Sequence, residues 1–396
     1  MRTRKPDMRC PANDGMMRSL PLRALHENRG ALFGERAGWE VPLSYSGLDE
    51  EVGATRSAAG LIDHSDRVTV RLTGADRVSF LNGLVTQDIA AMKPGECSYG
   101  LFLNPKGKVV GDAAVYALPD ALLLDLPPDE SGRVLEHIRK HLVSDDVAIE
   151  PFAAAHLALH GPMAPAFLRR VVGDMKPPAN GEFSTVPIDR KRSIVIAGTD
   201  YLRLPGFRFI SWTDSLEGVW RALTAFGPTP VVGATPVGRE AWNTLRIEAG
   251  RPVPGLDMDE NTIALEARME SAISYTKGCY EGQEVIARAT YQGHMNRLLV
   301  GFRGEGDSIP ARLSPVLLDG KQVGHVTSAT YSPTLRYVIA LGYIRKPGDA
   351  AGTRVEIVAD GWQIRATVLQ IPFVTGPRAR TSLPRIGLPS LASLSG

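Results

Sequence analysis

The stretch LFLNPKGKVVGDAAVYAL, residues 101–118, holds two apolar runs on either side of an Asn-Pro-Lys-Gly sequence. Asn, Pro and Gly favour tight turns, each through its own backbone preference. Two apolar runs joined by such a turn predict a β-hairpin with its turn at Asn104 to Gly107. Asp112 lies on the returning strand, as a polar side chain within a mostly apolar element.

Helical and extended patterns alternate on both sides of this hairpin. Apolar residues recur at helical spacing in Glu130 to Leu142. The segment Pro236 to Ala249 adds a proline at its start and Gly250 at its end, which are signals of helix boundaries. Further expected elements are a strand at Val68 to Leu72, a helix beginning within Gly74 to Leu81 and a strand at His156 to Leu159. This mixture predicts an α+β fold.

After about residue 295 the sequence becomes a series of short β-rich runs. The expected strands are Leu298 to Phe302, Val316 to Leu318, Val323 to Thr327, Tyr337 to Tyr343, Arg354 to Ile357 and Ile364 to Leu369. Such a series predicts a separate β-barrel or sandwich.

These patterns divide the chain into four parts. We expect a disordered leader over residues 1–15, with Met16 or Met17 as the true beginning, and a disordered tail over 373–396 rich in Pro, Arg, Ser and Gly. Between them, residues 16–293 are expected to form two interleaved α+β domains, and residues 294–372 the C-terminal β-barrel.

Composition excludes several classes of protein. The 396 residues carry 45 Lys plus Arg against 43 Asp plus Glu, a net charge of +2, so nothing in the overall balance demands nucleic acid or an anionic membrane. Three separated cysteines cannot form a disulfide framework, which favours a reducing, cytoplasmic setting. No apolar run approaches the roughly 20 residues that span a bilayer.

Several segments resemble a known family. The run LRIEAGRPVPGLDMDENT at 245–262 and the motif KGCYEGQE at 277–284 strongly resemble the signature region of the YgfZ family. The segments at 38–45, 60–65 and 81–88 look like the folate-binding domain that this family shares with the glycine-cleavage T-protein. The resemblance covers roughly residues 25 to 372.

The resemblance implies a three-domain cloverleaf around a central channel for tetrahydrofolate, with the β-barrel last. It also implies two competing functions. The expected one is a folate-binding accessory factor that helps iron–sulfur client proteins, or their assembly machinery, in cluster maturation or repair, with indirect effects on tRNA modification. The alternative is a T-protein-like transferase that moves an aminomethyl group from a lipoyl arm to tetrahydrofolate.

The resemblance and the residue chemistry together nominate the ligands of folate. Glu248 falls where the family has its pterin-contacting carboxylate, and a carboxylate can accept two neighbouring N–H groups; a solvated side chain near a helix end is the alternative. Asp112 could hold the reacting nitrogen, with a strand-end polar residue as the alternative, although the T-protein's paired acids are here reduced to one, with Gly111 in the other place. Arg239, like Arg251, Arg288 and Arg297, could pair with a folate carboxylate, as guanidinium groups do; a plain surface charge is the alternative.

The motif at 277–284 supplies a second group of candidates. Cys279, next to Lys277 and two glycines, is expected to be a reactive thiol, as a nucleophile, a redox centre or a transient metal ligand; a small buried residue is the alternative. Lys277 and Tyr280 are expected to contact the cofactor, unless the motif is only a turn between domains. His137 and His141 share a helix face, but no third metal ligand is evident in the sequence, so no metal site is expected.

Overall fold

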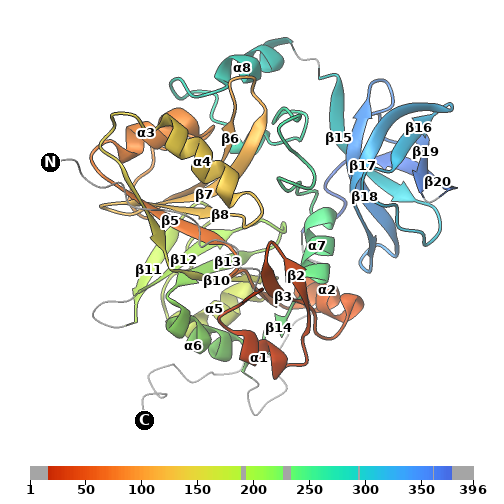
Figure 1. Cartoon of the computed structure of the whole chain (residues 1–396). Helices are drawn as coiled ribbons and strands as arrows, with labels where there is room; N and C mark the ends of the chain where they lie inside the picture. The colour runs from red at the N-terminus through yellow and green to blue at the C-terminus, as the bar shows by residue number, and fades with distance from the viewer. Residues whose placement is uncertain (1–16, 189–192, 226–232, 293–294, 360, 377–396) are drawn as a thin grey trace.

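The computed structural model describes residues 17–188, 193–225, 233–292, 295–359 and 361–376, and shows two packed sheets flanked by helices with a separate barrel beside them (Figure 1). The mixed α+β class and the closed C-terminal barrel are confirmed. The predicted leader and nearly all of the predicted tail lie outside the described residues. Among the described helices, none has the length and apolar character needed to cross a membrane.

The first large sheet has five strands in the order β6-β7-β8-β5-β9. Its strands are β5 (Val68–Thr73), β6 (Cys97–Leu103), β7 (Val109–Ala117), β8 (Leu122–Leu126) and β9 (Ala148–Phe152). The predicted hairpin is confirmed as β6 and β7, and Gly107 has φ +67° at its turn, a conformation that glycine adopts without strain. One sheet face packs on α3 (Arg77–Leu84) and α4 (Ser131–His141).

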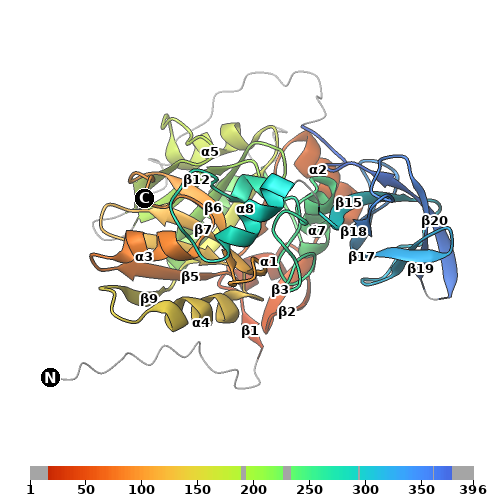
Figure 2. The same ribbon diagram turned by 90° about the horizontal axis from the view of Figure 1, so that it is seen from above.

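The second large sheet has six strands in the order β11-β12-β13-β10-β4-β14. Its strands are β4 (Gly60–Asp63), β10 (Ala155–His160), β11 (Phe183–Pro187), β12 (Ser193–Thr199), β13 (Gly206–Ser211) and β14 (Thr235–Pro236). Its outer face packs on α5 (Ala164–Val172) and α6 (Thr213–Thr224). Figure 2 shows α4 and α5 on opposite sides of the two sheets.

The two sheets face each other through side chains that alternate along their strands. Tyr116 and Leu123 of the first sheet pack against Phe183, Val195 and Ile210 of the second in one apolar cluster. The same inner faces carry charged residues farther along the strands, and these positions form the site described below. Alternation thus sends one set of residues to the helices and the other set to the space between the sheets.

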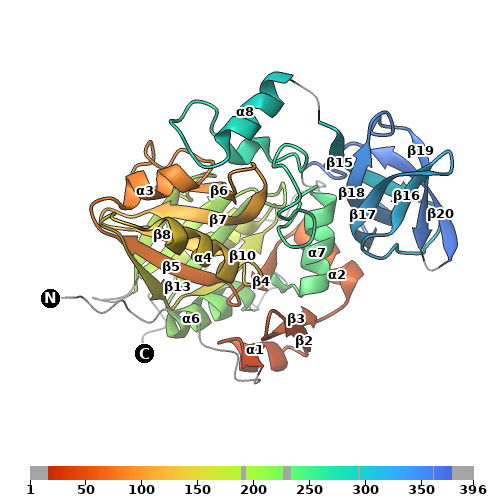
Figure 3. The same ribbon diagram turned by 45° about the horizontal axis from the view of Figure 1, so that its top comes forward.

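Helix α7 (Arg239–Glu248) lies between the sheets and the barrel (Figure 3). It packs on α2 (Leu48–Ser57), on the strand β3 (Trp39–Ser44) and on the barrel strand β17 (Lys321–Ser332). The small N-terminal sheet consists of β1 (Arg18–Ser19), β2 (Leu32–Arg36) and β3 (Trp39–Ser44), with α1 (Arg23–Glu27) between its first two strands. The predicted helices at 130–142 and 236–249 are found as α4 and α7, but the predicted start of the second is wrong: Pro236 lies on the strand β14, and α7 begins at Arg239.

The C-terminal strands close into a barrel in the order β15-β18-β17-β16-β19-β20. They are β15 (Arg297–Gly304), β16 (Pro315–Leu318), β17 (Lys321–Ser332), β18 (Tyr337–Arg345), β19 (Arg354–Ala359) and β20 (Trp362–Leu369). Alternate residues fill the barrel interior. The outward-facing Leu299, Leu341 and Tyr343 pack on the segment that carries the 3₁₀ turn Glu270–Ala272 and the helix α8 (Gln283–Gln292).

Candidate functional site

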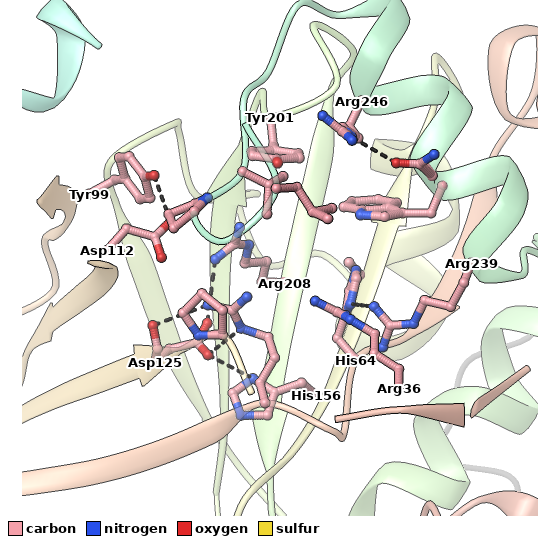
Figure 4. Close-up of a pocket in the computed structure, with 18 of the residues that line it drawn as sticks. Arg36, His64, Tyr99, Asp112, Asp125, His156, Tyr201, Arg208, Arg239 and Arg246 are labelled. Atoms are coloured by element: carbon pink, nitrogen blue, oxygen red, sulfur yellow. Dashed lines mark hydrogen bonds and ion pairs between the residues drawn. The ribbon is translucent and has the colours of Figure 1, made fainter. Parts of the chain in front are cut away.

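A cavity opens where the layer between the two sheets changes from apolar to charged residues. We call it the inter-sheet cavity (Figure 4). Its walls include the charged and aromatic residues Arg36, His64, Arg67, Tyr99, Asp112, Asp125, His156, Tyr201, Arg208, Arg239, Trp242 and Arg246. Asp112 and Asp125 come from β7 and β8, and His156 and Arg208 from β10 and β13. The cavity is therefore built mainly on rigid strands, with α7 closing one side.

Asp112 is the carboxylate at one end of the cavity. Tyr99 donates a hydrogen bond from its hydroxyl to Asp112 Oδ2 at 2.6 Å. The other oxygen, Oδ1, is buried and has no hydrogen-bond partner among the described residues. Burial raises the pKa of Asp112 above its ordinary value, although the Tyr99 hydrogen bond and the charge of Arg67 act in the opposite direction. Asp112 thus offers one free oxygen and holds a proton more readily than an exposed aspartate.

A second carboxylate, Asp125, fixes two arginines. Arg67 Nε donates to Asp125 Oδ1 at 2.5 Å, and Arg208 Nη1 lies 3.4 Å from Oδ2. Burial alone would raise the pKa of Asp125, but the charges of Arg67 and Arg208 and the hydrogen bond from Arg67 help to outweigh it and lower that pKa. Asp125 therefore remains ionised and holds both guanidinium groups in place.

A second group of cations lies across the cavity from Asp112 (Figure 4). Arg239 donates to His64 Nδ1 at 2.8 Å and pairs with Asp66, while its Nε is buried without a partner in the described part of the chain. Arg36 bridges Asp66 and Asp129 at 3.0 and 2.7 Å. Burial, together with the charge of Arg239, lowers the pKa of His64 well below its ordinary value, so His64 is neutral and accepts the bond from Arg239.

Aromatic rings form one wall of the cavity. The rings of Tyr201 and Trp242 stack with centroids 5.6 Å apart and planes 5° from parallel. His64 meets Trp242 edge to face at 4.6 Å. The cavity thus combines a flat apolar surface, one free carboxylate oxygen and several fixed cations, which suits an aromatic ligand that has N–H groups and an anionic end.

The structure brings together two of the residues nominated from the sequence, Asp112 and Arg239, at opposite sides of this cavity. It also explains the single acid at this hairpin. Gly111 faces α4, and a Cβ atom there would lie 2.4 Å from Val134 Cγ2. Since neighbouring strand residues point to opposite faces, a carboxylate at position 111 would not enter the cavity. The missing acid is therefore no argument against aminomethyl transfer.

Glu248 lies elsewhere, fully buried where α2, α7 and the barrel meet. Arg56 donates two hydrogen bonds to Glu248 Oε2, at 3.0 and 2.6 Å, and Ser332 donates one to Oε1 at 2.5 Å. It is not among the residues that line the inter-sheet cavity. Both of its oxygens accept hydrogen bonds from protein groups, and its nomination as a folate ligand stays an untested prediction.

The motif at 277–284 also lies outside the cavity. Lys277 Nζ donates to the backbone carbonyls of Asn82, Val85 and Gln87 at 2.5, 2.7 and 2.8 Å. It also lies 5.0 Å from the ring centre of the buried Tyr280. Burial lowers the pKa of Lys277 to about 8. The ammonium group is thus used to hold the 82–87 segment. Cofactor contacts for Lys277 and Tyr280 remain predictions without support from this geometry.

Cys279 is exposed on the same segment. Its expected reactivity was based on the charge of Lys277, but that ammonium is directed at three carbonyl groups. Cys97, on β6, is partly buried, and burial raises its pKa to about 11. A catalytic role for Cys279 stays untested.

Sequence reasoning missed most of the cavity residues. Arg208 and His156 lie on short strands whose pairing cannot be read from local patterns. Asp125 did leave a signal, because it is the only charged residue in the apolar run Leu122–Leu126. A second signal is the run Asp63-His-Ser-Asp-Arg67, whose dense titratable groups directly follow the fully buried β4. Such buried charges commonly mark functional sites.

Comparison with known proteins places most of the chain in one family. A family model described as the GCVT N-terminal domain matches residues 22–277. A second, described as the glycine cleavage T-protein C-terminal barrel domain, matches residues 297–375. The family match confirms, at the level of the family, the expectation of a tetrahydrofolate cofactor.

Individual relatives agree over almost their full length. An aminomethyltransferase of Rubrobacter xylanophilus is 33% identical over 363 residues, which cover 91% of this chain and 95% of that protein. An aminomethyltransferase of Halothermothrix orenii is 30% identical over 360 residues, which cover 90% of this chain and 100% of that protein. The crystal structure of glycine cleavage system aminomethyltransferase T from Bartonella henselae matches with a TM-score of 0.82 and 25% identity, covering 90% of this chain and 98% of that one.

These relatives correct the function expected from the sequence. An accessory role in iron–sulfur protein maturation, with client proteins and indirect effects on tRNA modification, is wrong as the main assignment, because curated relatives over about 90% of the chain are aminomethyltransferases. The physical reason for the error lies in the two features on which it relied. The missing acid at Gly111 would face α4, and the Lys277 motif packs as a scaffold. The chain belongs to the glycine cleavage T-protein family.

Proposed function

We propose that this protein is a tetrahydrofolate-dependent aminomethyltransferase and that its chemistry takes place in the inter-sheet cavity. The observation that carries the proposal is the free oxygen of Asp112. A buried carboxylate oxygen without a partner is costly in a folded protein. A ligand nitrogen in contact with Asp112 Oδ1 would explain why this oxygen stays unpaired at the cavity wall.

The described residues fit a folate. Tyr201 and Trp242 offer a flat apolar surface for an aromatic ring system. Asp112 Oδ1 offers an acceptor for an N–H group. Arg36 and Arg239, across the cavity, offer cations that suit the carboxylates of a glutamate tail. Bound tetrahydrofolate would supply the nitrogen that receives the one-carbon unit.

Asp112 is suited to move a proton at that nitrogen. Tyr99 holds one of its oxygens, which fixes the orientation of the carboxyl group. The raised pKa brings its protonated and ionised forms closer in free energy at neutral pH, as general acid–base catalysis requires. Asp125 meanwhile holds Arg67 and Arg208 in fixed positions, so that these cations need little reorganisation when a substrate binds.

The rate of ammonia release tests the chemistry, with an aminomethylated lipoyl carrier protein and tetrahydrofolate as substrates. The wild type is expected to turn over repeatedly. Asp112→Asn, which keeps the size of the side chain, is expected to lower kcat about 100-fold or more, as for loss of a general acid–base. Asp120→Asn, in an exposed ion pair with Arg71, is the matched control and is expected to keep the wild-type rate. Failure of the wild type to release ammonia would contradict the proposal.

Folate affinity tests the cationic side of the cavity separately. Arg239→Met is expected to weaken tetrahydrofolate binding by about 2 kcal/mol, the size of a lost charged hydrogen bond, as measured by calorimetry without the carrier protein. Arg71→Met removes an exposed arginine and is the control. Equal affinity in Arg239→Met and the wild type would remove this arginine from the binding site.

The finer resemblance of the 277–284 motif to the YgfZ type stays a prediction. The proposal does not depend on it, because none of these residues lines the cavity. Their contacts support a scaffold role for Lys277, which fixes the segment leading from α3 to β6.

A further inference from the structure

His137, His141 and Glu281 form a cluster of possible metal ligands outside the inter-sheet cavity. The two histidines lie one turn apart on α4. Glu281 comes from the segment between Cys279 and α8, far away in the sequence, and the fold brings it against this helix face. The sequence offered no third ligand for the histidine pair because that ligand comes from a distant segment.

The ligand atoms converge on one point. His137 Nε2 and His141 Nε2 each lie 3.1 Å from the same oxygen, Glu281 Oε2. All three ligand atoms lie within 4.8 Å of one another. Neighbouring ligand atoms in a tetrahedral zinc site, with bonds of about 2.0–2.1 Å, are about 3.3 Å apart. The spacing is therefore close to that of ligands around one ion.

One hydrogen bond fixes which nitrogen of a neutral His141 ring presents a lone pair to the cluster. His141 Nδ1 lies 2.9 Å from the backbone carbonyl oxygen of His137, so Nδ1 carries the proton and Nε2 presents a lone pair to Glu281. Metal-binding histidines commonly donate their second N–H in this way. His137 Nε2 and Glu281 Oε2 are both buried and have no hydrogen-bond partner within the described ranges, despite their close approach.

We propose that His137, His141 and Glu281 bind a divalent transition-metal ion of the Zn²⁺ type. Two imidazole nitrogens and one carboxylate oxygen are a ligand set that zinc accepts, with one coordination position left for water or another small ligand. The His141 side chain is 34% exposed, so the site can exchange ions with solvent. His137 and Glu281 are 11% and 14% exposed, which shields the other side of the ion.

The ion would connect helix α4 to the segment that carries Glu281. Helix α4 packs on the outer face of the first sheet, behind the hairpin that carries Asp112. Glu281 belongs to the segment whose Lys277 holds residues 82–87. An ion that cross-links these parts would stabilise the native state by an amount that increases with its free concentration.

Metal titration of the full chain tests this proposal independently of folate. Protein purified without a polyhistidine tag and stripped with a chelator would be titrated with Zn²⁺ by calorimetry and with Co²⁺ by visible absorption. The expected result is one ion per chain, with d–d bands of bound Co²⁺ and a Zn²⁺-dependent rise in melting temperature. Absence of stoichiometric binding to the wild type would overturn the proposal.

Three variants locate the site. His141→Ala and Glu281→Gln are each expected to weaken Zn²⁺ binding more than about 100-fold, since even groups that only orient ligands contribute about 10- to 100-fold. His325→Ala removes a partly exposed imidazole on the barrel strand β17 and is expected to bind Zn²⁺ like the wild type. Melting curves in chelator show that each variant is folded; if His141→Ala does not fold, Glu281→Gln decides. Unchanged affinity in the folded ligand variants would overturn the assignment.

Discussion

The cavity residues Asp112 and Arg239 and the motif residue Lys277 are all largely buried and charged, but the partners of their polar atoms differ. In the cavity, Asp112 and Arg239 each retain a buried polar atom that has no partner among the residues that the structure describes. In the segment 277–284, the ammonium of Lys277 is shared among three backbone carbonyls. Glu248, from the other stretch that resembles a known family, is likewise bound through both oxygens.

This difference separates residues that stabilise the fold from residues that serve a ligand. A buried charge with all of its partners in the protein supports the structure, and its removal leaves those partners unsatisfied. A buried polar atom that faces a cavity without a partner destabilises the free protein and is compensated when a ligand binds. A distinctive sequence motif therefore does not by itself locate the chemistry.

The largest expected effect comes from Glu248→Ala. The variant leaves Arg56 buried without its carboxylate and is expected to lose about 3–5 kcal/mol of unfolding free energy, as for other broken buried ion pairs. Urea unfolding measures the loss. Glu217→Ala, in an exposed pair with Arg221, is the control and should cost less than about 1 kcal/mol. If Glu248→Ala kept its stability but lost folate affinity, Glu248 would belong with the cavity residues.

Lys277→Met is expected to have the next largest effect. It leaves three carbonyl groups of the 82–87 segment without their donor, and about 3 kcal/mol of stability should be lost. Chemical unfolding at pH 7 measures this. Lys108→Met, which removes an exposed amine with one carbonyl partner, serves as the control. If Lys277→Met kept normal stability but no longer bound folate, Lys277 would be a folate-binding residue and not a structural one.

Gly111→Asp restores the second acid of the family's pair and so tests why it is missing. Its Cβ would lie 2.4 Å from Val134 Cγ2, and we expect a loss of about 2 kcal/mol of stability without any gain in transfer rate. The control is Gly53→Asp, at a position where an added Cβ meets no atom within 4 Å. A faster transferase without loss of stability would show that position 111 does reach the cavity.

Local patterns in the sequence predicted the elements better than the site. The hairpin of β6 and β7, the helices α4 and α7 and the barrel strands are set by apolar periodicity and turn residues within each segment. The cavity depends instead on pairing between distant strands, which sets Ala158 of β10 opposite Arg208 of β13. The resemblance supplies Asp112, and the affinity of guanidinium groups for carboxylates supplies Arg239, whereas Asp125 and Arg67 depend on the sheet register.

Asp112→Asn is expected to have the smallest effect on stability. Unlike the preceding variants, it is expected to raise the free energy of unfolding. Because burial raises its pKa, ionised Asp112 destabilises the folded state as pH rises through the folded-state pKa. The variant should therefore be more stable than the wild type at pH 7, by about 1 kcal/mol. This gain should shrink as pH falls toward the ordinary aspartate pKa of about 3.9. Urea unfolding at pH 7 and at lower pH measures it; a less stable variant at pH 7 would make Asp112 part of the scaffold.

The location of the chemistry is decided by one comparison. It measures the rate of ammonia release from an aminomethylated lipoyl carrier, in the presence of tetrahydrofolate, for the wild type, Asp112→Asn and Cys279→Ser. If the chemistry lies in the inter-sheet cavity, Asp112→Asn should be slower by about 100-fold or more and Cys279→Ser should remain within about twofold of the wild type. A slow Cys279→Ser beside a normal Asp112→Asn would contradict the account and place the chemistry on the exposed segment.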